Sequence, residues 1–413
     1  MSRLAEDRRA PVLTLAGALA VLVASHVLWL ALVRRGYPLN VDEAGYLGIA
    51  FDFTEAVRDG ALRTAWESQR SQAPLVPLLT APVGLVRMAI IPSYAVLIGF
   101  FVLLTLATYG VARRLVSPWW AVLAALVVAT LPAVTDLTRT YIFAVPAAAL
   151  TMSAIYALGR SDHLRHRRWA IAFGALIGLM VLSRTMNISY VPGLVTAAVV
   201  VLAAAPSGRR RGAVNLALGA LAGLFVAWTW YRTSWDTVLA YLRDAGYGDR
   251  SAEFSSGETG WGSSERWLAD IRNVVQNDLY VPMTVLLAAG LAAALAALVR
   301  RLRALGGTGE RVQALARSPA LVPAVVALEG YLAIVSSTNA GYAFALPLLA
   351  PIVVVAVAGL ARLPAGPART GLAVALAGGE RVQRAGEVRR HRAAGPAGPR
   401  RRAAHRGAFH QRF

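Results

Sequence analysis

The feature that most constrains this chain is a series of long apolar blocks separated by short arginine-rich segments. About 20 helical residues cross the hydrocarbon core of a bilayer, so apolar runs of about 18 or more residues predict membrane spans. The chain is 57% hydrophobic and only 15% charged, which is too apolar for an ordinary soluble protein. A β-barrel would instead show short strands of alternating hydrophobicity. We therefore expect an all-α polytopic membrane protein.

The apolar blocks predict about ten transmembrane helices, with boundaries defined only to within several residues. They are residues 12–33, 93–112, 119–135, 142–159, 169–182, 188–205, 213–231, 280–299, 319–335 and 342–362. The first block is too long for a cleaved signal peptide. Residues 73–91 are also apolar, but their prolines and Arg87 predict a broken or interfacial helix.

Arginine distribution predicts the orientation of these spans. Net positive segments separate alternate spans, at residues 112–114, 160–168, 207–211 and 300–311. The positive-inside rule places them in the cytoplasm and leaves two long external loops, 34–92 and 232–279. In the second loop, apolar residues near 235–242 and 267–271 predict two amphipathic helices, which would lie on the membrane as a lid. Arg34 and Arg35 follow the first span on the outside, where they would snorkel into headgroups or bind an anion.

Composition excludes several kinds of site. There is no Cys, so disulfides and thiolate metal sites are ruled out. Every basic residue is Arg, and we attribute the net charge of +20 to cytoplasmic loops and anionic lipid headgroups, not to nucleic acid. No phosphate-binding Gly-Lys-Ser/Thr loop and no zinc-type His-Glu-x-x-His pair occurs. Residues 363–413 are rich in Arg, Gly, Ala and Pro, which predicts either a disordered basic tail or a frameshift product.

The polar residues near the predicted spans gather at span ends on the external side. "NVDEAGYLGIA" (40–50) places Asp42 and Glu43 soon after the first span, whereas the span interiors are nearly free of charge. Transporters usually carry polar residues near the bilayer centre, so this pattern favours a site at the external membrane interface. The two carboxylates point about 100° apart on a helix, so we expect separate roles. The simpler alternative is that both are solvated interfacial residues.

Four segments carry a resemblance to a known family. They are "NVDEAGYLGIA" (40–50), "SQAPLVPLLTA" (71–81), "LTRTYIFAVPAAAL" (137–150) and "GLMVLSRTMNISYVPGL" (178–194). Together they resemble the loop signatures of the GT-C superfamily of membrane glycosyltransferases, including its protein mannosyltransferase-like and aminoarabinose transferase-like branches. The resemblance covers about residues 12–205. It departs from the family pattern at Ala144, where an Asp is expected, unless Asp136 substitutes.

The resemblance implies a GT-C-like transmembrane domain over residues 1–362 and a polyprenyl-phosphate-sugar donor. The enzyme would be an inverting hexosyl- or pentosyltransferase of a bacterial cell membrane, acting on an extracytoplasmic glycan, lipid or protein. An acidic residue of the first external loop is the family's catalytic candidate, which here is Asp42 as general base, with Glu43 as the other candidate. A positioned carboxylate base typically contributes roughly 10²–10⁴-fold in rate.

Arg184 is the strongest candidate for substrate binding, because it ends an otherwise apolar span. A guanidinium can hold a phosphate leaving group with two hydrogen bonds, although snorkelling is an equal alternative. Further candidates are Arg139 and Arg70 for the phosphate, and Tyr46, Asn339 and Tyr342 for the sugar or for closing the pocket. A tyrosine at this depth can also be a plain interfacial anchor.

Two questions stay open in the sequence. Some members of the family use a divalent cation, but the external carboxylates of this chain form no clear ligand set. The alternative to an enzyme is a non-catalytic transporter or scaffold for polyprenyl-linked envelope intermediates. A truncated, inactive product is a third hypothesis, because family members commonly have more spans or an extra C-terminal domain.

Overall fold

The computed structural model describes residues 9–68, 70–248, 264–337, 343–367 and 369–376, and among them there is no β-strand. The predicted all-α class is therefore confirmed. In chain order the helices are α1 (Arg9–Leu32), η3 (Arg34–Gly36), α2 (Val41–Arg58), α3 (Leu62–Glu67), α4 (Leu75–Val86), α5 (Ile90–Ser93), α6 (Ala95–Ala112), α7 (Pro118–Thr130), α8 (Pro132–Thr138), α9 (Ala144–Arg160), α10 (Arg167–Ser183), η4 (Thr185–Tyr190), α11 (Val191–Ala203), α12 (Arg209–Tyr247), α13 (Ser264–Asn273), η6 (Val274–Leu279), α14 (Val281–Arg303), α15 (Thr308–Ala316), α16 (Leu321–Ser336) and α17 (Leu346–Leu360).

By length and hydropathy, five helical segments in the described part of the chain can cross a membrane, or seven if two bent pairs each count as one span. The five are Arg9–Gly36, Ile90–Ala112, Thr185–Ala203, Arg209–Gly246 and Val281–Arg303. The pairs are α7 with α8, bent by 57°, and α15 with α16, bent by 84°. The chain is thus a multi-pass membrane protein, while the count of ten spans stays a prediction.

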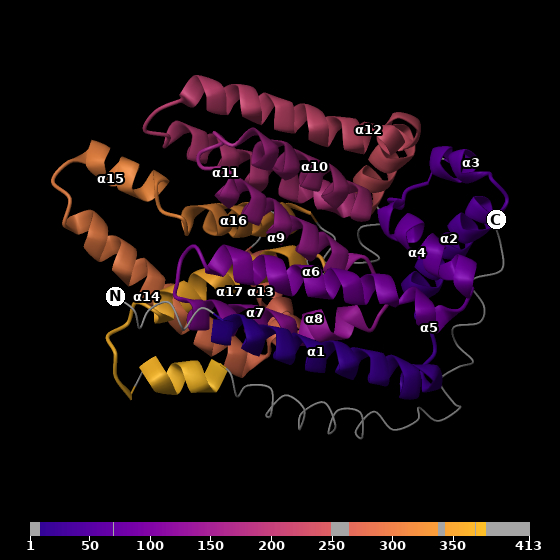
Figure 1. Ribbon diagram of the computed structural model, residues 1–413, viewed down its shortest axis with the longest axis horizontal. Coiled ribbons are helices and arrows are strands. Elements are labelled where there is room, and N and C mark those ends of the chain that lie inside the picture. The colour runs from indigo at the N-terminus through magenta and orange to yellow at the C-terminus, as the bar shows by residue number, and fades with distance from the viewer. Residues whose placement is uncertain (1–8, 69, 249–263, 338–342, 368, 377–413) are drawn as a thin grey trace.

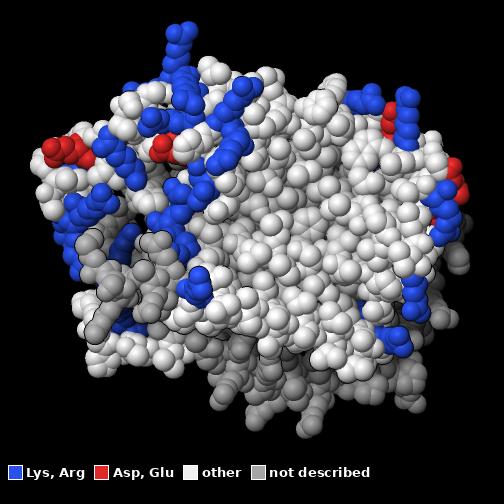
Figure 2. All heavy atoms as spheres, viewed as in Figure 1, with Lys and Arg blue, Asp and Glu red and all other residues white. Residues whose placement is uncertain are grey.

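The long helices lie side by side, with α2 to α5 together at one end of the bundle and α15 at the other (Figure 1). Figure 2 shows arginines gathered over the end that carries α15, a broad uncharged band across the middle, and a mixture of acidic and basic residues at the far end. We call the two ends the arginine-rich end and the α2 end. The positive-inside rule predicts that the arginine-rich end faces the cytoplasm.

The centre of the bundle is α9, which is buried along most of its length and packs against α6, α10 and α17. A helix of 17 residues falls short of the about 20 that span a bilayer alone. Because neighbouring helices cover α9, its sequence reflects packing against protein as well as against lipid.

Closely packed glycines join α10 to α12. Gly174 and Gly178 of α10 face Gly219 and Gly223 of α12, and a Cβ atom on Gly174 would lie 1.8 Å from the carbonyl oxygen of Gly219. Small residues four apart allow the backbones of two membrane helices to approach this closely. The contact fixes α10, which ends directly before Arg184.

The predicted first amphipathic helix of the 232–279 loop is wrong as a separate element. α12 is one helix of 39 residues, so residues 235–242 are part of it and not a separate element. Its last residues, including Leu242 and Gly246, line the cavity that Arg184 borders. No Gly or Pro stands between residues 224 and 245, and nothing therefore breaks the helix.

The second predicted helix of that loop is present as α13, where Trp267, Leu268 and Ile271 are exposed. The predicted lid segment between the two helices lies mostly outside the described residues. The prediction for residues 73–91 is confirmed, because α4 has only 12 residues and ends before α5 begins. The tail predicted over residues 363–413 is not disordered at its start, because residues 369–376 are helical and Leu376 is buried. Residues 377–413 lie outside the described residues.

Candidate active site

The first external loop folds into α2, whose first turn carries both candidate carboxylates. The Asn40 side chain caps this helix by accepting a hydrogen bond from the backbone N–H of Glu43 at 2.7 Å. Acidic residues in a first turn are favoured by the helix dipole. The turn of the helix then separates their environments: Asp42 is exposed and Glu43 is buried.

Glu43 is the centre of a buried polar cluster. Its Oε2 accepts from Arg34 Nη2 at 2.6 Å, and its Oε1 accepts from the Tyr94 hydroxyl and from the backbone N–H of Tyr141 at 2.8 Å. Arg34 is only 5% exposed, so the prediction that it snorkels into headgroups is wrong. The anion that it binds is Glu43. Both carboxylate oxygens are occupied, and the cluster ties α2 to the segments that precede α6 and α9.

Asp42 lies beside Tyr46, four residues later on the same helix, where side chains are neighbours. The ring of Tyr46 is half-buried and packs on Phe143, with 4.4 Å between ring centroids. Burial raises the pKa of Tyr46, the positive charge of Arg184 lowers it, and the charges of Tyr241 and Asp42 raise it. Among the described residues, no ion pair joins Asp42 to Arg184.

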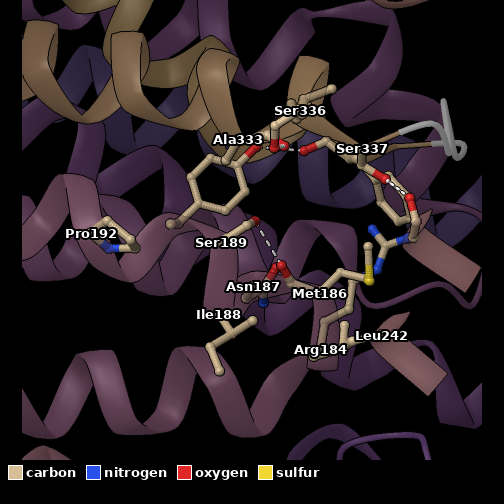
Figure 3. A pocket seen from close by; sticks show the side chains of 14 residues that line it. Arg184, Met186, Asn187, Ile188, Ser189, Pro192, Leu242, Ala333, Ser336 and Ser337 are labelled. Atoms are coloured by element: carbon tan, nitrogen blue, oxygen red, sulfur yellow. Dashed lines mark hydrogen bonds between the residues drawn. The ribbon is translucent and has the colours of Figure 1, made fainter. Parts of the chain in front are cut away.

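Arg184 follows the last turn of α10, and its side chain is buried. Its Nη1 donates to the Ala343 carbonyl at 3.3 Å, and its guanidinium lies 4.7 Å from the centroid of the Phe344 ring. The group borders a cavity of about 280 Å³. Figure 3 shows Arg184 and Met186 at one end of the cavity, near Ser337, and Pro192 at the other. A buried guanidinium at the wall of a cavity of this size suits a phosphate ester.

A second, smaller cavity adjoins the first, because Ile334 and Phe344 border both. It measures about 40 Å³, and its walls include the buried Asp278 of η6. Burial, with the negative charge of Asp136, raises the pKa of Asp278 to about 7. The sequence analysis did not select this residue. Its position was nevertheless informative, because Asp278 closely precedes the predicted span 280–299, just as Asp42 follows the span 12–33.

The structure does not bring Arg70 or Arg139 to the cavity beside Arg184, because neither borders it. Arg70 forms an ion pair with Asp52 at 3.1 Å. Arg139 donates to His26 at 3.2 Å and lies 5.2 Å from the centroid of the Trp29 ring.

Other sequence predictions meet different outcomes. Asn339 and Tyr342 lie outside the described residues. Tyr141, from the quoted segment 137–150, is fully buried and shares a hydrogen bond with Thr80 at 2.5 Å, so its ring belongs to the core and is not an interfacial anchor. Within the described ranges, no three His, Asp or Glu side chains gather closely enough to hold a metal ion.

Comparison with known proteins identifies the fold. No protein-family model and no curated protein matches the chain. Among solved structures, ArnT of Cupriavidus metallidurans bound to undecaprenyl phosphate matches with a TM-score of 0.60 and 16% identity, over 88% of this chain and 62% of that one. The apo oligosaccharyltransferase of Archaeoglobus fulgidus matches with a TM-score of 0.53 and 15% identity, over 90% of this chain and 54% of that one.

Both matched proteins are GT-C glycosyltransferases, so the resemblance drawn from the loop motifs is confirmed at the level of the fold. The chain spans less than two thirds of the length of either structure.

Proposed function

We propose that this protein is an inverting membrane glycosyltransferase that moves a sugar from a polyprenyl-phosphate donor to an acceptor outside the cytoplasm. The proposal is supported above all by one observation: on a GT-C fold, the exposed Asp42 begins α2 of the first external loop, and Thr185, next to Arg184, donates to the Ser71 carbonyl of the same loop at 2.6 Å. The reaction requires a base for the acceptor and a cation for the departing phosphate. Asp42 and Arg184 supply one of each.

The chemistry divides between the two residues. The Asp42 carboxylate takes the proton of an acceptor hydroxyl while that oxygen attacks the anomeric carbon of the sugar. The bond from the anomeric carbon to the phosphate oxygen breaks, and the electron pair leaves with the polyprenyl phosphate. Arg184 holds this anion with charge-assisted hydrogen bonds. A single displacement of this kind inverts the anomeric centre.

Exposure favours Asp42 over Glu43 as the base. Asp42 is exposed at the start of α2, whereas both oxygens of Glu43 accept hydrogen bonds inside the protein. A general base must reach the proton that it removes to within hydrogen-bond distance. We therefore assign Glu43 to holding the loop and Asp42 to the chemistry.

The test measures release of polyprenyl phosphate from labelled polyprenyl-phosphate sugars by purified protein in lipid nanodiscs. We expect Asp42→Asn to lower the turnover roughly 10²–10⁴-fold, the usual contribution of a positioned base. Asp59→Asn is the matched control, because Asp59 is exposed at the other end of the same helix. Its turnover should equal that of the wild type.

Two results would reject the proposal. One is full turnover by Asp42→Asn. The other is a wild-type protein that, in sealed vesicles, moves the lipid-linked sugar across the membrane but never releases polyprenyl phosphate, as a transporter would. Arg184→Gln should mainly raise the KM for the donor, because Arg184 is proposed to hold the phosphate in the ground state as well as in the transition state.

A further inference from the structure

A cavity of about 520 Å³ lies between α6 and α9, toward the arginine-rich end and away from the candidate active site. Its long wall is apolar and includes Leu103, Leu106 and Tyr156. Leu103 and Leu106 are 36% and 48% exposed, so this wall opens to the surroundings of the bundle. We call this cavity the α6–α9 groove.

Three arginines, Arg113, Arg114 and Arg160, line the groove at its end nearer the arginine-rich end of the bundle. Among the residues that the structure describes, no carboxylate forms an ion pair with any of them. Asp162 acts on Arg114 through its charge, but its own ion pair is with Arg165 at 3.7 Å.

The arginines also sit close enough to oppose one another. Burial, together with the positive charge of Arg160, lowers the pKa of Arg114. Arg160 lies 5.4 Å from the centroid of the Trp169 ring, and Arg113 donates to the Val116 carbonyl at 3.3 Å. Neither contact neutralises a charge. An anion between these groups would relieve their repulsion.

Two glycines shape the groove around its polar and aromatic groups. A Cβ atom on Gly159 would lie 3.0 Å from Arg114 Nε, so the arginine rests directly against the backbone of α9. A Cβ atom on Gly110 would lie 2.7 Å from the ring of Tyr156. A side chain at Gly159 or Gly110 would therefore occupy the space that the Arg114 guanidinium and the Tyr156 ring now fill.

We propose that the α6–α9 groove binds an anionic phospholipid of the leaflet at the arginine-rich end. The phosphate lies between Arg114 and Arg160, and an acyl chain lies along Leu103 and Leu106. Basic pockets between membrane helices on the cytoplasmic side suit anionic lipid headgroups. Inorganic phosphate offers the same anion but has nothing to occupy the apolar wall, so the wall favours a lipid.

The first arm of the test removes charge from the groove. Purified protein in phosphatidylcholine nanodiscs that contain a minor fraction of phosphatidylglycerol is released and weighed by native mass spectrometry. We expect wild-type protein to retain phosphatidylglycerol and the double variant Arg114→Gln/Arg160→Gln to bind it with about thirtyfold lower affinity. Each arginine near an anionic lipid contributes about 1 kcal/mol, and a change of 1.4 kcal/mol corresponds to roughly tenfold in affinity.

The control variant is Arg300→Gln/Arg301→Gln, which removes the same charge from two exposed residues in the last turn of α14. It should retain phosphatidylglycerol as the wild type does. An equal loss in both double variants would show a diffuse surface effect and overturn the proposal. Thermal unfolding of each variant, recorded in phosphatidylcholine alone, confirms that the groove variant is folded.

The second arm separates a lipid from a free anion. Leu106→Trp fills the apolar wall and keeps every charge, so it should abolish retention of phosphatidylglycerol without changing the weak binding of inorganic phosphate. Retention equal to wild type in Leu106→Trp, or displacement of the lipid by inorganic phosphate, would show that only the anion is recognised. Sugar transfer is not the readout in either arm, so the outcome is independent of the proposed activity.

Discussion

At the scale of single residues, adjacent carboxylates illustrate what a sequence can and cannot predict. Helical geometry predicts that Asp42 and Glu43 point in different directions. Which of them is buried depends on Arg34 and Tyr94, which the fold brings to Glu43. Local spacing carries no information about the Tyr94 contact, and the orientation of the helix could therefore not be predicted.

We predict that Glu43→Gln destabilises the protein by about 3–5 kcal/mol in its free energy of unfolding. Removing one charge of a buried pair leaves the other uncompensated, and here that charge is Arg34. The measurement is thermal unfolding in detergent, with Glu55→Gln on the exposed face of the same helix as the control. Wild-type stability combined with lost turnover would instead place Glu43 in the chemistry.

A second residue-scale prediction concerns pH. The pKa of Asp278 is raised from 3.8 to about 7, so the folded protein holds this proton more tightly than the unfolded chain does. The resulting stabilisation is complete below about pH 4 and is lost as the pH rises through about 7. Asp278→Asn mimics the neutral acid and should therefore be more stable than wild type above about pH 7, by about 4 kcal/mol at most.

The check on Asp278 is the difference in unfolding temperature between variant and wild type across the pH range. Asp236→Asn, at an exposed position of α12, is the control and should show no such trend. A difference that does not grow between about pH 4 and about pH 7 would mean that Asp278 is ionised in the folded state.

At the scale of elements, hydropathy located the helices but missed the break at Leu131, which divides the predicted span 119–135 into α7 and α8, and placed a loop where α12 continues. The first apolar block became α1, and the residues before Arg113 became α6, close to their predicted bounds. The polarity of residues 232–247 marked them as a loop, but polarity does not end a helix. Without Gly or Pro between residues 224 and 245, α12 continues as one helix into this polar stretch.

The contact between α10 and α12 yields the prediction for this scale. Gly174→Val would place a branched side chain against the backbone of Gly219, which cannot move aside as a side chain does. We expect a loss of about 1–3 kcal/mol in stability, typical of overpacking, and weaker donor binding, because α10 leads directly to Arg184.

Gly17→Val is the matched control for this contact, because a Cβ atom on Gly17 meets nothing within 4 Å. The measurements are thermal unfolding and the affinity for a polyprenyl-phosphate sugar. If Gly174→Val unfolds and binds as the control does, the two helices do not touch in the membrane.

At the scale of the whole molecule, the membrane class and the GT-C fold could be predicted, but the meeting of distant groups could not. Tyr46 and Arg184 belong to segments that the motifs identify separately. How the first external loop meets the end of α10, for example through the hydrogen bond from Thr185 to the Ser71 carbonyl, is contained in no local pattern. The α6–α9 groove was missed for the same reason, because its arginines come from two segments that each read as an ordinary cytoplasmic loop.

Orientation is the last whole-molecule property, and it decides which compartment the candidate active site faces. The chain has no Cys, so each introduced cysteine is the single reactive thiol. Asp59→Cys, at the end of α2, marks the α2 end, and Arg301→Cys, in the last turn of α14 just before α15, marks the arginine-rich end (Figure 1); both positions are exposed. Because positive segments stay in the cytoplasm, we expect a membrane-impermeant maleimide to label only Asp59→Cys in intact cells and both after permeabilisation. The reverse pattern would place Asp42 in the cytoplasm, where an extracytoplasmic acceptor cannot reach it.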